Sequence, residues 1–335
     1  MDISSLALIS ITVLFVFLDG LNDSANLVST VVSSRALSPQ KAVLLAAGGE
    51  LLGACFLGSA VAQTIGKEMV LVSGPAHAAY PILWAALSAI SAAFLWGVVS
   101  WRLGLPCSST HSLLGGWVGA FLALAGWSMI QWHKVASVFL IILVSPLVGF
   151  SVSWLLMKGI QKSIQGLPLK LGKVVRVLES IWLGILSLAH GANDGQKSMA
   201  VLVAGLMLGG RHDAYSIPLW VRLTCSLAIS LGVLVGSSRT IRTLGFSLYK
   251  VQSIHSLCSQ SVSGMLILLS TLLGFPLSTG QVVSSSIMGV GAGVQPRAVR
   301  WDVALEIGMN WILTLPLSAG LAYFMLKLAL LFLRP

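Results

Sequence analysis

The chain has 335 residues, of which 56% are hydrophobic and only 9% are charged, and it carries a formal net charge of +10. A soluble domain usually has about 25% charged residues, so this composition excludes an ordinary soluble protein and indicates an all-α polytopic membrane protein. No basic stripe or nucleic-acid-binding module accompanies the positive charge. The enrichment of cytoplasmic loops in Lys and Arg explains it better.

The first apolar segment contains a polar run, Gly-Leu-Asn-Asp-Ser-Ala-Asn, from Gly20 to Asn26. A segment of this kind without a basic n-region or a cleavage site predicts a retained helix. One Asp at the centre of a bilayer costs roughly 2.5–3.5 kcal/mol on insertion scales. We expect Gly20 to interrupt the helix, because half-helix ends in mid-membrane are where secondary transporters bind ions. A buried network of polar side chains between helices is the alternative.

Glu50 lies in the next apolar segment, between Leu44 and Leu57. A carboxylate inside a membrane helix is a functional candidate. The alternative is a structural ion pair with a basic residue such as Arg222.

A helical hairpin is expected from about Ile82 to Gly126, with the segment Leu105 to His111 (Leu-Pro-Cys-Ser-Ser-Thr-His) at its tip. Proline is tolerated at a helix start, and Ser and Thr cap it. Free backbone N–H groups, the helix dipole and hydroxyls together make an anion site; ordinary capping is the alternative. His111 at the end of the run could accept a proton near neutral pH, or be a satisfied buried histidine.

A further crossing, Val135 to Met157, leads into a basic loop at 158–176. The loop is rich in lysine and arginine: Lys158, Lys162, Lys170, Lys173 and Arg176. It divides the chain into a first transmembrane repeat at 1–157 and a second at 177–335, and by its charge it is expected to be cytoplasmic.

The second half repeats the motifs of the first. Gly-Ala-Asn-Asp at Gly191 to Asp194 follows the first signature by 171 residues, and it adds His190, Gln196 and Lys197. Phe-Pro-Leu-Ser-Thr-Gly-Gln, ending at Gln281, follows the first hairpin motif by 170 residues. Two motifs at nearly one offset predict an internal duplication. Two more apolar runs, Ile217 to Gly236 and Val303 to Leu326, are long enough to cross a bilayer.

Loop charge predicts the orientation. With the central loop inside, both termini lie outside, and the inner loops hold most of the basic residues. The two repeats are then inverted relative to each other. Whether each hairpin crosses the membrane fully or re-enters partway, the loops beyond it stay on the same sides, so the choice between the two stays open. No P-loop, Rossmann fingerprint or His-Glu-x-x-His motif is present, so an ion gradient rather than ATP is the expected source of energy, and no cofactor is expected.

These motifs resemble those of the inorganic phosphate transporter (PiT) family, over nearly the whole chain. The family carries two Gly-Ala-Asn-Asp-type signatures and two Gly-Leu-Pro-x-Ser-Thr-Thr-His-type segments in inverted repeats. Here they stand at Gly20 to Asn26, Gly191 to Lys197, Gly104 to His111 and Gly274 to Gln281. The family imports phosphate with sodium or protons, and some members look like sulfate permeases.

The resemblance implies a set of site residues. The anion would be held at the two hairpin tips, by Ser108, Ser109, Thr110, Ser278 and Thr279. The coupling cation, sodium or a proton, would be organised by the two signatures, at Asn22, Asp23, Asn193 and Asp194. Apart from the resemblance, the polar runs themselves add Gly280 as an anion candidate and Asn26 and Gln196 as cation candidates. A sodium ion is expected at Asn22, Asp23, Asn193 and Asp194. Further candidates are Glu50, His111, Lys197 and Gln281.

The chain also departs from the family pattern. Leu21 replaces Ala in the first signature, Gly280-Gln281 replaces Thr-His in the second hairpin, and Gln260 stands where some relatives have a second glutamate. These changes bear on the coupling ion, its stoichiometry and the choice of oxyanion.

The sequence therefore predicts a phosphate–cation symporter of the plasma (inner) membrane that works by alternating access and is not an enzyme. A sulfate permease of the same fold is the first alternative, ahead of an intramembrane lipid-phosphate enzyme and a passive channel. The expected partners are phosphate or sulfate and membrane lipids, without nucleic acid, and a homodimer is left open.

Overall fold

The computed structural model describes residues 3–68, 79–104, 107–164, 172–208, 216–236 and 248–332. Within these ranges every regular element is helical, which confirms the predicted class. The α-helices are α1 (Ile3–Ser33), α2 (Pro39–Phe56), α3 (Ala60–Glu68), α4 (Ala79–Leu103), α5 (Ser109–Ala125), α6 (Trp132–Ile164), α7 (Gly172–Leu208), α8 (Leu219–Val235), α10 (Ser253–Leu272), α11 (Thr279–Val294) and α12 (Trp301–Phe332). Two short 3-10 helices, η2 (Trp127–Met129) and η5 (Pro296–Ala298), precede α6 and α12.

Five of these helices, α1, α4, α6, α7 and α12, are long and apolar enough to cross a membrane. The predicted spans Val135 to Met157 and Val303 to Leu326 lie inside α6 and α12. The third, Ile217 to Gly236, becomes the shorter apolar helix α8, with 17 residues. Leu140, Leu147 and other large apolar side chains of α6 are exposed, as expected for a surface that faces lipid. The chain is an integral membrane protein.

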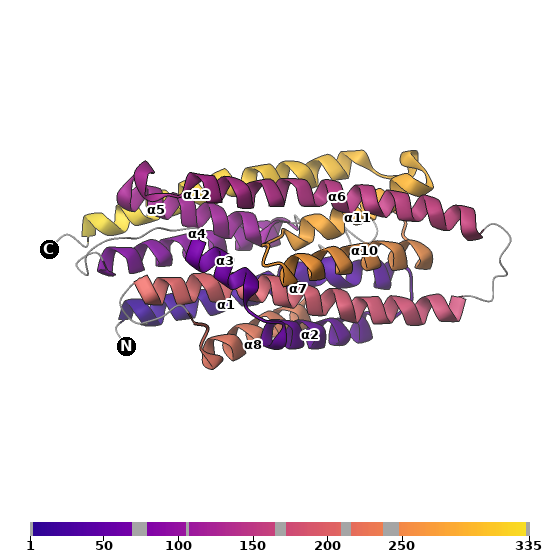
Figure 1. The fold of residues 1–335 in the computed structure, drawn as a ribbon, viewed down its shortest axis with the longest axis horizontal. Helices are drawn as coiled ribbons and strands as arrows, with labels where there is room; N and C mark the ends of the chain where they lie inside the picture. The colour runs from indigo at the N-terminus through magenta and orange to yellow at the C-terminus, as the bar shows by residue number, and fades with distance from the viewer. Residues whose placement is uncertain are drawn as a thin grey trace.

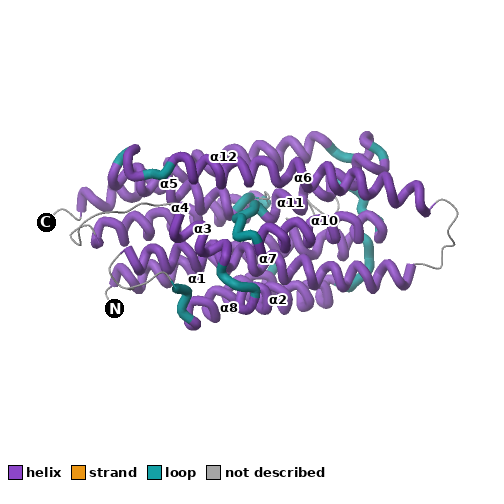
Figure 2. The backbone as a smooth tube through the Cα atoms, viewed as in Figure 1, coloured by secondary structure: helices purple, strands orange, loops and turns teal. Residues whose placement is uncertain are grey.

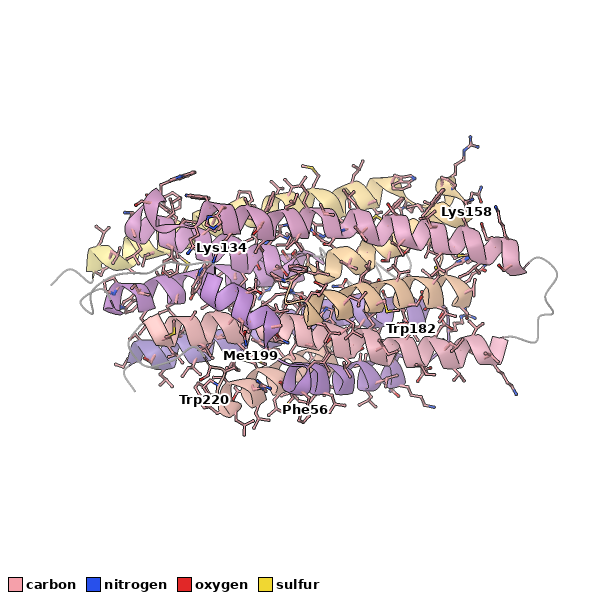
Figure 3. All side chains as sticks on the ribbon, viewed as in Figure 1. Phe56, Lys134, Lys158, Trp182, Met199 and Trp220 are labelled. Atoms are coloured by element: carbon pink, nitrogen blue, oxygen red, sulfur yellow. The ribbon has the colours of Figure 1, made fainter. Side chains whose placement is uncertain are left out.

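The helices run along the long axis of the molecule (Figure 1). The start of α1 and the end of α12 lie at one end, and the end of α6 and the start of α7 lie at the other. Lys134 and Lys158 mark the two ends of α6 (Figure 3). The loop charges predict the same arrangement, with both termini on the side opposite the central basic segment. Which end faces the cytoplasm stays a prediction. Of the central basic loop, Lys170 falls outside the described residues.

Two helical hairpins enter the bundle from opposite ends. The hairpin of α4 and α5 occupies the end where α1 begins, and the hairpin of α10 and α11 occupies the opposite end (Figure 1). Their tips meet in the interior, where the hydroxyls of Ser108 and Ser278 are 2.8 Å apart, and loop backbone is visible in the middle of the bundle (Figure 2). The hairpins are therefore re-entrant. Irregular backbone at membrane depth is tolerated because protein surrounds it. Leu105 and Pro106 of the first tip lie outside the described residues.

The packing of the two halves is reciprocal. Helix α5 packs on α12 while α11 packs on α6, and α1 packs on α8 while α7 packs on α2. Pro146 inside α6 and Pro316 inside α12 stand 170 residues apart, at the offset of the hairpin motifs. Two related halves would produce this pattern, in which each helix packs on a helix of the other half. The division of the chain around 158–176 remains a prediction.

The predicted break of the helix at each Asn-Asp signature is wrong. Helices α1 and α7 run without interruption through Gly20 and Gly191. A Cβ at Gly20 would collide with the backbone of Ile229 in α8, and one at Gly191 with the backbone of Glu50 in α2. Small residues let membrane helices approach closely, so these glycines serve helix contact, and side chains rather than opened backbone supply the polar groups.

Candidate functional site

Ionisable side chains from α1, α2 and α7 meet in the core of the bundle. The His190 ring lies centrally, with Nδ1 2.9 Å from Oε1 of Glu50 and Nε2 3.5 Å from Oδ2 of Asp23 and 3.4 Å from Oδ2 of Asp194. These are ion-pair distances, but none has hydrogen-bond geometry, and neither ring nitrogen has a hydrogen-bond partner among the described residues. All four side chains are buried. Three carboxylates around one imidazole attract positive charge to this point.

One set of atoms in this cluster fits a cation. A ligand atom from each of Asp23, His190 and Asp194 lies within 4.8 Å of the other two. Carboxylate oxygens suit hard cations. The cluster therefore brings together two of the predicted cation residues, Asp23 and Asp194, which are 171 positions apart in the sequence.

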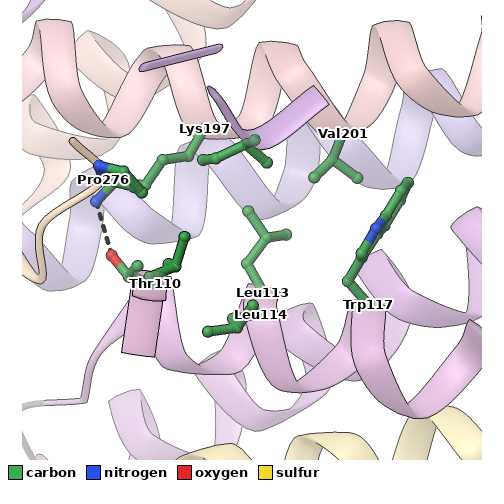
Figure 4. Close-up of a pocket in the computed structure, with 9 residues that line it drawn as sticks. Thr110, Leu113, Leu114, Trp117, Lys197, Val201 and Pro276 are labelled. Atoms are coloured by element: carbon green, nitrogen blue, oxygen red, sulfur yellow. Dashed lines mark hydrogen bonds between the residues drawn. The ribbon is translucent and has the colours of Figure 1, made fainter. Parts of the chain in front are cut away.

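The Lys197 ammonium is the second centre of positive charge. It donates to Asp194 Oδ1, to the backbone oxygen of Leu277 and, over 2.7 Å, to Thr110 Oγ1 (Figure 4). Its side chain is only 3% exposed. These acceptors come from α7, from the first turn of α5 and from the tip that leads into α11. Lys197 therefore connects the second signature to both hairpins.

The hairpin tips bind each other directly. Ser108 caps α5 by accepting from the backbone N–H of His111 at 3.1 Å, and the same hydroxyl is 2.6 Å from His111 Nδ1. Thr110 Oγ1 donates to the Leu277 oxygen at 2.9 Å. In the second hairpin Thr279 donates to Asp194 Oδ2 at 2.7 Å. Four of the hydroxyls predicted to hold an anion, those of Ser108, Thr110, Ser278 and Thr279, are therefore hydrogen-bonded to other groups of the protein.

Asn193 anchors the second tip and does not face the cation cluster. Its amide nitrogen donates to Thr271 Oγ1 at 2.9 Å and to the Phe275 oxygen at 3.2 Å, and its oxygen accepts from the N–H of Leu277 at 3.3 Å. The backbone of the tip at Phe275 and Leu277 is thus held by the Asn193 side chain of α7.

The first signature makes a simpler set of contacts. Asn26 donates to Asp23 Oδ1 at 2.6 Å, and a Cβ on Gly280 would press on the Asn26 amide, so Asn26 lies against the start of α11. Asn22 is half-buried and points to α4, where it donates to the Gly97 oxygen at 3.5 Å. Asn22 therefore lies beside the first hairpin and not with Asp23.

Two other residues singled out in the sequence have contacts away from this centre. Gln196 accepts from the N–H groups of Val61 and Ala62 and donates to the Leu57 oxygen, so it holds the junction of α2 and α3. Arg222 donates to the Cys55 oxygen at 3.3 Å, and the neighbour of Glu50 is His190 instead.

The remaining candidates lie on the two short hairpin helices. Ser109 is half-buried in the first turn of α5. His111 and Gln281 both border a cavity of about 510 Å³ between α6 and α12, and the Gln281 oxygen is buried with no hydrogen-bond partner in the described part of the chain.

The space beside Lys197 is small. The cavity lined by Thr110, Lys197 and Pro276 has a volume of about 20 Å³ (Figure 4). A single water needs about 10–15 Å³ by this kind of measure, so the cavity admits about one water and no tetrahedral oxyanion. Any anion that binds between the tips must first separate them.

No role for His190 was predicted from the sequence, although the structure puts its ring at the centre of the acidic cluster. A signal was available: His190 precedes Asp194 by four residues, and residues at this spacing share one face of a helix. The contact with Glu50, 140 positions earlier, has no such local signal.

Fold and site together define a membrane protein of the transporter class, with two re-entrant hairpins around a buried charged centre. The sequence profile described as "Phosphate transporter family" matches residues 19–177 and 167–322. A probable low-affinity inorganic phosphate transporter of Rhizobium meliloti is 35% identical over 95% of both chains. A protein of Bacillus subtilis with the same description is 32% identical over 94% of both chains.

The chain belongs to the phosphate transporter family, whose members are transporters and permeases and not enzymes. The intramembrane enzyme is thereby excluded. Among solved structures, one described as the sodium-dependent phosphate transporter superposes with a TM-score of 0.86, covering 99% of this chain and 100% of that one at 23% identity. This likeness confirms the fold.

Proposed function

We propose that this protein is a secondary transporter that moves inorganic phosphate across the membrane together with a cation, by alternating access. The observation that carries the proposal is the meeting of both hairpin tips at the Asp194–Lys197 pair. The descriptions of the two bacterial relatives as low-affinity inorganic phosphate transporters support the substrate. The solved neighbour is described as sodium-dependent, and this supports coupling to a cation.

The anion would bind where the tips now touch. Ser108, Thr110, Ser278 and Thr279 supply hydroxyl donors, and the start of α11 at Gly280 supplies backbone N–H groups. Ser109 would join them from the first turn of α5. Lys197 supplies a charged donor. Phosphate is partly protonated at physiological pH and can donate to a carboxylate such as Asp194, whereas sulfate cannot, and this favours phosphate.

The cation would bind between Asp23, His190 and Asp194. Its charge would offset the crowded carboxylates and lower the cost of bringing an anion to the same place. Sodium and a proton are both compatible with carboxylate and imidazole groups. Binding of cation and anion at adjacent positions would couple their movement, because each reduces the electrostatic penalty of the other.

Alternating access would follow from the hairpins. Each tip reaches the site from a different end of the bundle, so separation of one hairpin from the site would open it to one side only. The two halves, 1–157 and 177–335, would act as inverted repeats that exchange conformations. We place the protein in the plasma membrane, with both termini outside and the basic segment at 158–176 in the cytoplasm.

Uptake of radiolabelled phosphate into proteoliposomes tests the proposal. Uptake should require an imposed sodium or proton gradient and should fall in a variant with Asp23→Asn and Asp194→Asn. Flux that ignores the gradient would indicate a passive channel. Competition with unlabelled sulfate is the matched control for substrate, because equal competition by sulfate and phosphate would favour the sulfate permease.

A further inference from the structure

The two signatures differ at the third residue after the aspartate. The first has Asn26 three positions after Asp23, and the second has Lys197 three positions after Asp194. Both side chains turn back to the carboxylate of their own signature, Asn26 to Asp23 Oδ1 and Lys197 to Asp194 Oδ1. A neutral amide in one half thus corresponds to an ammonium in the other.

The surroundings of Lys197 are those of a bound cation. A lysine ammonium has three donors and no acceptor, and Lys197 reaches three acceptors: the Asp194 carboxylate, the Thr110 hydroxyl and the Leu277 carbonyl. The Leu277 carbonyl belongs to the irregular tip before α11. Unwound backbone carbonyls also hold coupling cations in transporters, and carboxylate oxygens suit hard cations. The ammonium nitrogen occupies the centre of this oxygen set.

The surroundings of Asn26 are incomplete in comparison. Its amide nitrogen donates to Asp23, but its buried oxygen Oδ1 has no hydrogen-bond partner in the described ranges. A buried polar atom without a partner costs roughly 1–3 kcal/mol. Asp23 therefore sits beside an unused oxygen ligand and has no lysine, whereas Asp194 has one.

We propose that the Lys197 ammonium is a tethered cation that occupies, in the second half, the place of one exchangeable coupling cation. The cation that must come from solution is then the one beside Asp23, and each phosphate moves with one cation fewer than it would if residue 197 were neutral. This inference rests on the proposed function of phosphate–cation transport.

Lys197→Asn tests the inference, because it copies the first signature into the second and supplies an oxygen in place of the ammonium. In proteoliposomes at fixed pH and clamped membrane potential, the number of sodium ions that activate phosphate uptake should rise by one relative to the wild type. The charge moved per phosphate should rise by one as well. Activation by sodium of about tenfold is expected, in the usual range of coupling between sites.

Two control variants distinguish the effect of the positive charge from the effect of an added oxygen ligand. Lys197→Arg keeps the tethered charge and should keep the wild-type cation number. Lys197→Met removes the charge without supplying an oxygen, and sodium should not restore its uptake. A Lys197→Asn protein that transports with the wild-type number of cations overturns the inference, and so does a gain of sodium activation in Lys197→Met equal to that in Lys197→Asn.

A binding measurement covers the case in which Lys197→Asn folds but does not transport. Thermal unfolding of the purified protein in detergent is compared in sodium chloride and in choline chloride, without phosphate. Sodium should raise the unfolding temperature of Lys197→Asn more than that of the wild type and of Lys197→Met, and equal shifts in all three overturn the inference. Absence of phosphate uptake by the wild type would instead contradict the proposed function.

Discussion

The two Asn-Asp signatures have nearly the same residues but different surroundings. Asp23 in α1 contacts a neutral amide and lies 3.5 Å from His190. Asp194 in α7 binds Lys197 and Thr279 and also lies near His190. The second signature therefore carries the charged link between both hairpins, whereas the first has a neutral amide at the corresponding position.

This difference shows that the two copies of a duplicated motif can take different roles. Asp194 is held by groups of the protein, so its position defines where the hairpin tips meet. Asp23 has no lysine of its own and shares His190 with Glu50 and Asp194. Under the proposed function, Asp194 would help to define the anion site, and Asp23 would meet the cation that comes from solution.

The largest effect is expected from Asp194→Asn, which leaves the buried Lys197 ammonium without its carboxylate. Breaking one partner of a buried ion pair costs about 3–5 kcal/mol. Asp23→Asn, the matched change in the first signature, keeps an oxygen that accepts from Asn26 and leaves no lysine unpaired, so it should cost only about 1 kcal/mol. Unfolding of the purified variants in detergent measures both.

The difference between the two signatures can be tested by restoring the stability of the Asp194→Asn variant. Adding Lys197→Met to Asp194→Asn removes the unpaired charge, so the double variant should recover most of the lost stability without recovering transport. Equal destabilisation by Asp194→Asn and Asp23→Asn, with no rescue, would mean that the two signatures do not differ as described.

Close packing of helices, in contrast, should contribute equally to stability in both halves. Gly20→Ala and Gly191→Ala each place a methyl group against the backbone of a neighbouring helix, and overpacking costs typically 1–3 kcal/mol. Gly48→Ala in α2, where nothing lies within 4 Å of the added carbon, is the control and should be neutral or slightly stabilising. Loss of stability in Gly48→Ala as large as in the other two would argue against the packing explanation.

The smallest effects are expected at the contact of the tips. Ser108→Ala and Ser278→Ala each remove one end of a single hydrogen bond, worth about 1 kcal/mol. Both should raise the KM for phosphate uptake, because each removes a hydroxyl donor from the proposed anion site. Ser108→Ala should raise it more, because its hydroxyl also caps α5 and contacts His111. Ser112→Ala, whose hydroxyl donates to the Ser109 oxygen within α5, is the control and should leave the KM unchanged.

The sequence was sufficient for the class of fold and for the two pairs of motifs, because apolar runs and a common offset are visible along the chain. It could not show that Gly20 and Gly191 serve close packing, since a glycine reads the same where a helix breaks and where a neighbour approaches. Gln196 looked like a cation ligand because it is polar and near Asp194, yet its partners lie on a distant turn at 57–62. Contacts such as these depend on three-dimensional packing and not on local pattern.

The hairpin tips must separate for phosphate to pass between them. Ser108→Cys with Ser278→Cys, in a Cys107→Ala background, tests this requirement, because the two hydroxyls are 2.8 Å apart and a disulfide needs only a small shift from that distance. In proteoliposomes, oxidation of this protein should abolish phosphate uptake and reduction should restore it, while each single cysteine variant is unaffected by oxidant. Undiminished uptake by fully cross-linked protein would contradict the account.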